Sequence, residues 1–351
     1  MNQKDVPESP GVPGQDLPTS PLGPFSASDL PLDEQGRIYH LQIKPDQLAP
    51  DILIVGDPGR AEMIGSTFLH DIEVEHEHRG LVTITGLSAV SGEPATILSP
   101  IKTTVTTSGM GTPSLEIILQ ELVALNEIDF TTRLPRRRFP RLQIIRVGTS
   151  GALQASTRLG TLIITSYSIG MDNTGLYYEA PYPDETCLRL EKDVHQLVNK
   201  YMDPGSRSYG KIHPYVSRAE PKVVNALMEA AQRLGTAAKI GLTVSCGGFF
   251  APQGRDIARV SPSLPDLDRI FSDFNPKLAD QRIENMEMES SFLNHFLGGL
   301  GYWGGAICAT IAHRREDRFK HNYQKIVHDS VEVALSALAA LRAQYPDGME
   351  R

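Results

Sequence analysis

Short apolar runs alternate along the chain with longer segments in which apolar residues recur every three or four positions. A short run of apolar or β-branched residues, bounded by glycine, proline or polar residues, is typical of a strand buried in a sheet. Strands are therefore predicted at Ile52–Val55, Leu81–Thr85, Ala95–Leu98, Thr103–Thr107, Gln143–Val147, Leu162–Tyr167, Ile240–Ser245 and Gly305–Ile311.

Helices are predicted between these strands. Pro113 opens one, since proline is favoured at the first helical position, and apolar residues repeat behind it at helical spacing. Further helices are expected at Val223–Leu234, Met286–Phe296 and Tyr323–Leu341. This alternation favours an α/β fold of one domain, a three-layer sandwich with a central mixed β-sheet flanked by helices.

The first 33 residues differ from the rest. They hold seven of the 25 prolines, many serines and glycines, and no apolar periodicity, which is typical of a disordered arm. The folded domain is therefore predicted over residues 34–345. Within it, we interpret the arginine-rich segment Thr131–Arg141 as a surface turn and the polar stretch 256–280 as a lid or a surface insertion.

Composition argues against several classes of protein. The net charge of −8 over 351 residues disfavours general nucleic-acid binding, which needs a basic face. No apolar run approaches the roughly 18 residues of a membrane span, and the N-terminus lacks a signal-peptide pattern, so a cytoplasmic protein is expected. Three cysteines without metal-like spacing are expected to be reduced, and His76 and His78 have no further ligands nearby, so no metal site is predicted.

Three arginine-bearing segments, far apart in the chain, have the character of a phosphate site. Gly56–Arg60 follows Ile52–Val55, and Arg146–Gly151 follows another apolar run, so each places an arginine and glycines at the end of a strand. The third arginine is Arg79. Ligands of open α/β sheets bind outside the carboxyl ends of strands, and the planar guanidinium donors suit phosphate.

Other segments suggest sites for a planar ring and a sugar. Phe249–Arg255 brings an aromatic ring, an amide and a guanidinium within seven residues, a set that could stack on a ring and read its polar edge. Asn285–Ser291 carries two carboxylates two positions apart, and a carboxylate that accepts from vicinal hydroxyls is a common ribose contact. His40 could present an imidazole to a hydroxyl. Together these features suggest a nucleoside that meets inorganic phosphate.

The chain resembles the nucleoside phosphorylase family, and within it the uridine phosphorylases, in particular their longer bacterial members. The resemblance spans about residues 37–340 and is carried by four motifs in the same order, Gly56–Arg60, Arg146–Ala152, Phe249–Arg255 and Asn285–Ser290. It implies a pentosyltransferase that converts uridine and phosphate reversibly into uracil and ribose 1-phosphate. The family needs no cofactor, because inorganic phosphate is a co-substrate.

The resemblance also implies roles for individual residues. The matched phosphate ligands are Gly56, Arg60, Arg79, Arg146 and Thr149. The matched ribose ligands are His40, Met288 and Glu289, and the matched base ligands are Phe249, Gln253, Arg255 and Arg314. Arg146, Gln253 and Arg255 are the expected catalytic residues. In the family Arg79 and His40 reach across from a neighbouring subunit, which implies a homo-oligomer, either a dimer or a hexamer.

Departures from the family pattern bear on specificity. His313 replaces the asparagine of uridine phosphorylases and the aspartate of purine-cleaving relatives, which argues against purines, although a histidine could act as an acid. Pro252 replaces a glycine before Gln253 and indicates a differently shaped base loop. Gly80 replaces a glutamate that helps bind a monovalent cation in some bacterial members, so no potassium site is expected.

Several alternatives stay open at this point. They are a purine-type phosphorylase, a nucleosidase that uses water on the same fold, and a nucleoside binder without activity. Three arginines suited to phosphate argue against the nucleosidase. The sequence does not decide between uridine, thymidine and deoxyuridine.

Overall fold

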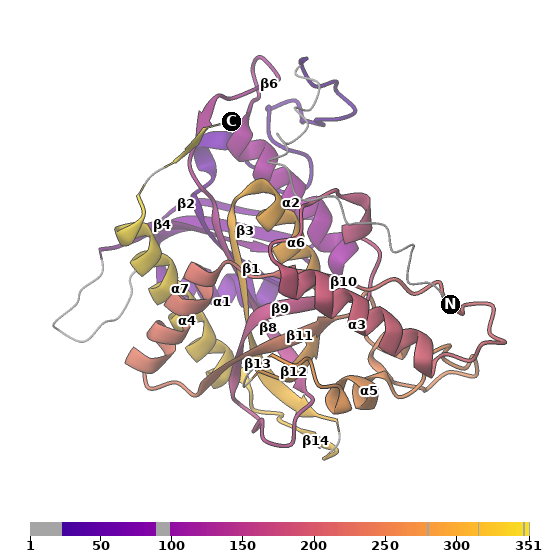
Figure 1. The fold of residues 1–351 in the computed structure, drawn as a ribbon. Helices are drawn as coiled ribbons and strands as arrows, with labels where there is room; N and C mark the ends of the chain where they lie inside the picture. Colours follow the sequence, from indigo (N-terminus) through magenta and orange to yellow (C-terminus); the bar gives the residue numbers. More distant parts are fainter. Residues whose placement is uncertain (1–22, 89–98, 279–280, 315, 347, 351) are drawn as a thin grey trace.

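The computed structural model describes residues 23–88, 99–278, 281–314, 316–346 and 348–350, and Figure 1 shows their fold. Within these ranges, eleven strands form one mixed sheet in the order β14-β13-β9-β11-β12-β8-β1-β4-β3-β2, with β10 paired to β9. The strands are β1 (Asp51–Val55), β2 (Leu69–His78), β3 (Leu81–Ser88), β4 (Ile101–Thr107), β8 (Gln143–Ala152), β9 (Leu162–Gly170), β10 (Tyr215–Arg218), β11 (Ala238–Ser245), β12 (Ile283–Glu287), β13 (Trp303–His313) and β14 (Arg318–Phe319).

Strand β1 organises the half of the sheet that resembles an open α/β fold. It pairs in parallel with β4 and with β8, which places Val55 opposite Thr107 and Ile54 opposite Arg146. Because β1 and β4 end at the same edge, the segments that follow them lie beside the middle of β8. The sheet register therefore brings Gly56–Arg60 to Arg146.

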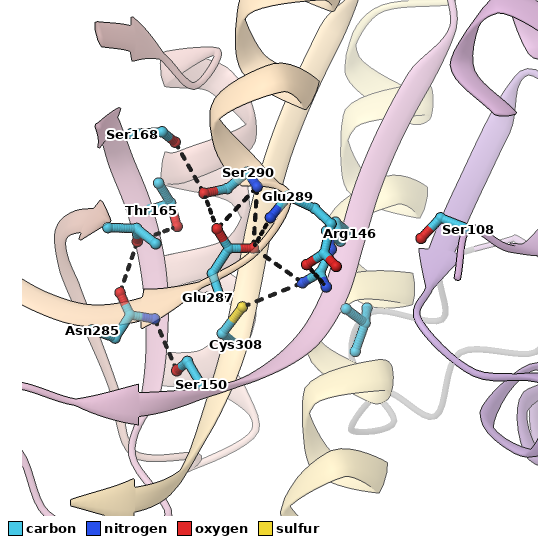
Figure 2. A network of polar contacts seen from close by, with 12 residues as sticks. Ser108, Arg146, Ser150, Thr165, Ser168, Asn285, Glu287, Glu289, Ser290 and Cys308 are labelled. Carbon is cyan, nitrogen blue, oxygen red and sulfur yellow. Dashed lines mark hydrogen bonds and ion pairs between the residues drawn. The ribbon is translucent and has the colours of Figure 1, made fainter. Parts of the chain in front are cut away.

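The other half of the sheet closes on itself. β13 pairs in parallel with β8 and antiparallel with β9, while β9, β11 and β12 pair in parallel before β12 returns to β8. A chain of buried polar side chains links four of these strands (Figure 2). Thr165 and Thr243 lie 2.7 Å apart, Thr243 donates to Asn285 at 2.8 Å, and Asn285 donates to Ser150 at 2.9 Å.

Helices cover both faces of the sheet, as Figure 1 shows. One apolar core is formed with α1, α4 and α7, a second with α2 and α6, and a third with α3 and α5. The helices are α1 (Pro58–Phe68), α2 (Thr112–Glu127), α3 (Glu185–Tyr201), α4 (Pro221–Arg233), α5 (Leu267–Asp273), α6 (Ser290–Leu300) and α7 (Gln324–Gln344). The predicted three-layer α/β sandwich with a mixed sheet is confirmed. No helix in the described ranges is long and apolar enough to cross a bilayer.

Two predicted boundaries are wrong around the motifs. The glycine-bearing segment after Arg146 is not a loop, because β8 continues to Ala152 and pairs there with β13. The predicted helix Met286–Phe296 begins too early, because β12 runs to Glu287 beside β11 and α6 starts only at Ser290. In both places, pairing with a distant strand overrides the local pattern.

Two other segments differ from the predicted elements or add to them. Strand β2 was not predicted, since most of its side chains are at least partly exposed and its sequence, rich in histidine and glutamate, lacks an apolar run. The predicted strand Ala95–Leu98 lies outside the described residues. The predicted surface insertion 256–280 contains the helix α5.

Residues 23–33 are packed against the domain, although disorder was predicted up to residue 33. Leu30 is buried in the core that also contains Ile38. Arg133, from the predicted surface turn, donates to the carbonyl oxygens of Phe25 at 2.7 Å and Ser26 at 2.8 Å, and to that of Leu30. One buried leucine and one arginine from a distant loop therefore fix this segment. Residues 1–22 lie outside the described residues.

Candidate active site

Arg146 lies near the middle of β8, and its side chain is buried. Its guanidinium contacts both carboxylates of the predicted ribose motif. Nη2 donates to Glu289, and Nη1 lies 3.3 Å from Oε2 of Glu287 and 3.7 Å from Sγ of Cys308, as Figure 2 shows. The arginine predicted to bind phosphate and the glutamate predicted to bind ribose are therefore direct neighbours.

Gly148 makes this arrangement possible. A Cβ atom at Gly148 would lie 2.0 Å from Nη1 of Arg146 and 3.0 Å from Sγ of Cys308. Glycine is therefore required here by the close approach of the guanidinium and not by its backbone angles. The Nε atom of Arg146 is buried and has no hydrogen-bond partner among the described residues.

The charges around Arg146 support one another. Burial alone would lower the pKa of the guanidinium, but Glu289 and Glu287 together raise it above its ordinary value. Burial raises the pKa of the Glu289 carboxyl, and Arg146 opposes that rise. Buried charges persist only when they are paired and hydrogen-bonded, so this cluster is a prearranged cation beside prearranged carboxylates.

Glu287 and Glu289 have different surroundings. The Glu287 carboxylate accepts from the backbone N–H of Glu289 at 3.0 Å and from the backbone N–H and hydroxyl of Ser290 at 3.0 and 2.7 Å. The first N–H groups of a helix lack intrahelical acceptors, and Glu287 supplies an acceptor for them at the start of α6. Glu289 faces away from the helix, and its Oε1 accepts from the N–H of Gly111 at 2.7 Å.

The segment Gly56–Arg60 forms the turn into α1. Asp57 caps the helix by accepting from the Arg60 N–H at 2.9 Å. The Arg60 side chain reaches β8, where Nη1 donates to the carbonyl of Val147 at 3.1 Å, and Nη2 lies 3.3 Å from Asp57. Burial lowers the pKa of Arg60, Asp57 opposes this, and the nearby Arg146 lowers it further. Arg60 and Arg146 are near enough for their charges to interact, and two such guanidinium groups are suited to an anion with several oxygens.

A fifth segment, residues 108–112, belongs to the site and was missed from the sequence. It joins β4 to α2, and Gly109 and Gly111 have positive φ angles of 70° and 88°, which glycine adopts freely. A Cβ atom at Gly111 would lie 3.8 Å from the carbonyl oxygen of Gly247 and 3.9 Å from Cε of Met288. The loops after β4, β11 and β12 therefore meet at Gly111. The sequence signal was a strand followed by glycines and a helix-opening proline, the pattern also found at Gly56–Pro58.

The residues predicted to hold the base form one cluster after β11. Arg255 donates from Nη1 to Oε1 of the buried Gln253 at 2.7 Å and to the carbonyl of Phe249. The guanidinium carbon of Arg255 lies 3.7 Å from the centre of the Phe249 ring, and that ring is 50% exposed. Burial lowers the pKa of Arg255 to about 10, with a further contribution from Arg314.

Arg314 lies behind this cluster. Its Nη1 donates to the backbone carbonyl of Gln253 at 2.9 Å, its Nη2 donates to that of Gly254 at 3.2 Å, and Nη2 lies 3.4 Å from Asp268. These contacts differ from the direct base contact that the resemblance implied, because they hold the backbone of the base loop. His313 is buried, with Nε2 3.1 Å from the carbonyl of Gln154.

Thr149 and Met288 complete the set of matched residues near Arg146. Thr149 is half-buried on β8, three positions beyond Arg146 and opposite Ala309 of β13. Met288 is half-buried between the two glutamates and reaches Gly111. Both lie in segments that carry the matched motifs, and their roles as ligands stay predictions.

His40 and Arg79 lie together in a different place. Arg79 is exposed, donates to the Tyr39 hydroxyl at 3.3 Å, and lies 6.0 Å from the centre of the Tyr39 ring. The Tyr39 ring contacts the His40 ring edge-on at 4.8 Å, and His78 lies 3.3 Å from the His40 carbonyl. We call these four residues the aromatic–basic patch. No hydrogen bond or ion pair of the described ranges joins the patch to Arg60, Arg146 or Gln253, so the roles of its members stay predictions.

Comparison with known proteins places this geometry in context. The sequence model of the phosphorylase superfamily matches residues 50–344. The uridine phosphorylase of Thermococcus kodakarensis is 29% identical over 333 residues, covering 93% of this chain and 94% of that protein. A DeoD-type purine nucleoside phosphorylase of Listeria monocytogenes is 32% identical over 223 residues, 59% of this chain and 85% of that protein. A solved Trypanosoma brucei nucleoside phosphorylase, reported to show uridine phosphorylase activity, aligns with a TM-score of 0.78 at 27% identity, over 89% of this chain and 100% of its own.

Proposed function

Because this chain belongs to the phosphorylase superfamily, we propose that it catalyses the reversible phosphorolysis of uridine to uracil and ribose 1-phosphate. One observation carries the proposal, namely the buried contact of Arg146 with Glu289. It joins a cation suited to phosphate to a carboxylate suited to ribose, and Glu289 also binds Gly111, where the loops after β4, β11 and β12 meet. The similarity to uridine phosphorylases over nearly the whole chain supports the choice of a pyrimidine nucleoside.

In this proposal the phosphate is bound mainly by positively charged guanidinium groups. The loop at Gly56, the Thr149 hydroxyl and the guanidinium groups of Arg60 and Arg146 contact its oxygens, and Arg79 of a neighbouring subunit supplies a third guanidinium. Glu289 accepts from the ribose hydroxyls. Because Arg146 contacts Glu289 directly, these ligands hold phosphate and C1′ of the ribose in adjacent positions, which is catalysis by positioning and preorganised charge.

The reaction then needs no covalent intermediate with the protein. A phosphate oxygen forms the bond to C1′ as the bond from C1′ to N1 of uracil breaks, and the bonding pair leaves with the uracil. Negative charge grows on the uracil carbonyl oxygens, where Arg255 and Gln253 would donate more strongly in the transition state than in the ground state. Arginine can only donate, so the Gln253 atom 2.7 Å from Arg255 is the amide oxygen, and the amide nitrogen remains a donor.

Two alternatives are less well supported. A purine nucleoside would call for an acid near the leaving base, and His313 is buried with its Nε2 bonded to a backbone carbonyl. A nucleosidase would use water, which does not call for the close pair Arg60 and Arg146. The similarity to a purine phosphorylase makes inosine the necessary comparison substrate.

The test is the ultraviolet absorbance of uridine, thymidine and inosine with purified protein, each with and without inorganic phosphate. We expect phosphate-dependent loss of uridine with release of uracil. Equal rates without phosphate would identify a nucleosidase, preferential cleavage of inosine would identify a purine-type enzyme, and no turnover of any of the three would reject the proposal. Gln253→Ala should then reduce turnover of uridine about 100-fold, the scale expected when a donor to developing charge is removed.

A further inference from the structure

Glu121 is a buried carboxylate on α2 with no role in the site described above. Among the described residues, every hydrogen-bond partner of its carboxylate comes from the turn that carries His40. Oε1 accepts from the backbone N–H of His40 at 2.9 Å, and Oε2 accepts from the backbone N–H of Leu41 at 2.8 Å. Oε1 also lies 2.7 Å from Nδ1 of the His40 ring.

These contacts fix which ring nitrogen of His40 carries hydrogen. Both oxygens of Glu121 already accept backbone N–H groups, so the carboxylate acts as an acceptor. A second acceptor at 2.7 Å would be repelled, and Nδ1 therefore carries a hydrogen that it donates to Glu121. In the neutral ring the other nitrogen, Nε2, is then an acceptor, which is the form that can receive the hydrogen of a hydroxyl group.

The ring is also fixed in direction. Tyr39 packs against it edge-on at 4.8 Å, and the carbonyl of His40 lies 3.3 Å from Nδ1 of His78. The His40 side chain is 25% exposed, while that of Glu121 is 9% exposed. The buried Glu121 thus fixes the partly exposed His40 ring. The other ring nitrogen of His40, Nε2, belongs to the aromatic–basic patch.

The position of Glu121 along α2 indicates whether His40 acts in the site of its own chain or in that of a second copy. Helix α2 begins after Gly111, whose N–H binds Glu289 in the ribose part of the site. Glu121 is ten residues further on, which corresponds to roughly 15 Å along a helix. A His40 ring bonded to Glu121 is therefore held well away from Glu289 of its own chain, in keeping with an action on a second copy.

The family resemblance implies that His40 reaches the 5′-hydroxyl of a nucleoside bound by a neighbouring copy. We propose that Glu121 is the positioning residue for this contact, because it fixes His40 in the Nδ1-protonated form and so leaves Nε2 to accept the hydroxyl hydrogen. The inference rests on the proposed function and names the residue that orients this contact. It predicts that Glu121 matters only for substrates that carry this hydroxyl.

The test compares uridine with 5′-deoxyuridine, which lacks that hydroxyl, in the wild type, His40→Ala and Glu121→Gln. A glutamine keeps the size of Glu121 but replaces one acceptor by a donor. We expect Glu121→Gln to lower kcat/KM for uridine about tenfold or more, the scale typical of a residue that orients a functional histidine. The value for 5′-deoxyuridine should change little, and His40→Ala should show the same selectivity.

Glu116→Gln is the matched control. Glu116 lies on the same helix and accepts from the Tyr178 hydroxyl, so its replacement removes a comparable bond without touching His40. The ratio of kcat/KM for the two substrates should stay at the wild-type value in this variant. If Glu121→Gln lowers both substrates by the same factor, Glu121 is only structural and the inference is wrong.

A second measurement keeps the inference separate from the proposed function. Long-range ¹H–¹⁵N NMR of protein with ¹⁵N-labelled histidine reports the protonated ring nitrogen, and His40→Ala assigns the signal. The Nδ1-protonated form in the wild type and its loss in Glu121→Gln would support the inference. An Nε2-protonated ring would overturn it, whatever nucleoside the protein uses. Absence of uridine turnover by the wild type, in contrast, rejects the proposed function.

Discussion

Arg146 and Glu289 form a buried ion pair between the middle of β8 and the segment that leads into α6. The pair joins two motifs that are 143 positions apart in the sequence. Because Glu289 also accepts from Gly111, the pair connects the loop after β4 to β8. The proposed phosphate and ribose contacts thus share one rigid cluster, and changes to it should affect chemistry and stability together.

Replacing Arg146 by alanine should damage both properties. The variant leaves Glu287 and Glu289 buried without their cation, and breaking a buried pair in this way typically costs about 3–5 kcal/mol. We also expect kcat/KM for phosphate to fall at least about 100-fold, because a preorganised cation is lost. Urea unfolding followed by the fluorescence of the single tryptophan, Trp303, gives the stability. Full activity of a folded Arg146→Ala protein would contradict the assignment.

Gly148→Ala should reduce activity while leaving the fold intact. The new methyl group would lie 2.0 Å from Nη1 of Arg146, so the guanidinium must move. We expect kcat/KM to fall by at least about tenfold, since displacing a catalytic group by an ångström is enough for such a loss. Gly151→Ala is the control, because a Cβ atom there meets nothing within 4 Å on the same strand. Equal kinetics of the two variants would show that the position of the Arg146 guanidinium is unimportant.

If Arg79 acts in the site of a neighbouring copy, two inactive proteins should restore one another. Arg79→Ala and Arg146→Ala are expected to be inactive alone. In mixed dimers one of the two sites receives an intact Arg79 and an intact Arg146, so random mixing should recover about a quarter of the wild-type activity. Co-expression with two different affinity tags provides the mixed oligomers. No recovery in a purified mixed oligomer would place Arg79 in its own chain's site or outside any site.

Asp51 and Arg342 give a prediction about pH. Asp51 starts β1 in a buried position, and both its oxygens accept from Arg342 of α7, with distances of 3.0 to 3.2 Å. Burial raises the pKa of Asp51 above its ordinary value of 3.8, and Arg342 only partly opposes this. The folded state therefore holds this proton more tightly than the unfolded state does, and the resulting stability is present below 3.8 and lost as pH rises through the folded pKa.

The measurement is the unfolding free energy of the wild type minus that of Asp51→Asn, from urea titrations between acid and neutral pH. This difference should fall as pH rises above 3.8 and then level off. A difference that grows with pH would mean that the carboxylate is favoured in the folded state, contrary to the direction used here.

Much of the fold could be predicted because its signals are local. Buried parallel strands such as β1 are continuous apolar runs, and helices such as α2 open with proline and repeat every three or four residues. The glycine-rich end of β8 misled the prediction, because Gly148 makes room for Arg146 and the segment continues as a strand paired with β13. Strand β2 carries little apolar signal, since its partner β3 and not its own sequence defines it.

The sequence motifs identified most residues of the candidate site. Gly56–Arg60, Arg146, Glu289 and the base loop were named from the sequence, and the sheet register brings the first three together. The sequence did not reveal residues that act through others. Glu121 looks like any helical glutamate until the fold places it beside His40, 81 positions away. The support that Arg314 gives to the base loop likewise depends on contacts that no spacing encodes.

The most direct test of the central claim is ³¹P NMR of uridine and inorganic phosphate incubated with the protein. The account predicts that the phosphate signal is converted into that of a sugar phosphate ester in step with the uracil released, and that Arg146→Ala slows both. Release of uracil with the phosphate signal unchanged would contradict phosphorolysis and make water the nucleophile. Absence of both changes, with folded protein and excess substrates, would contradict uridine as the substrate.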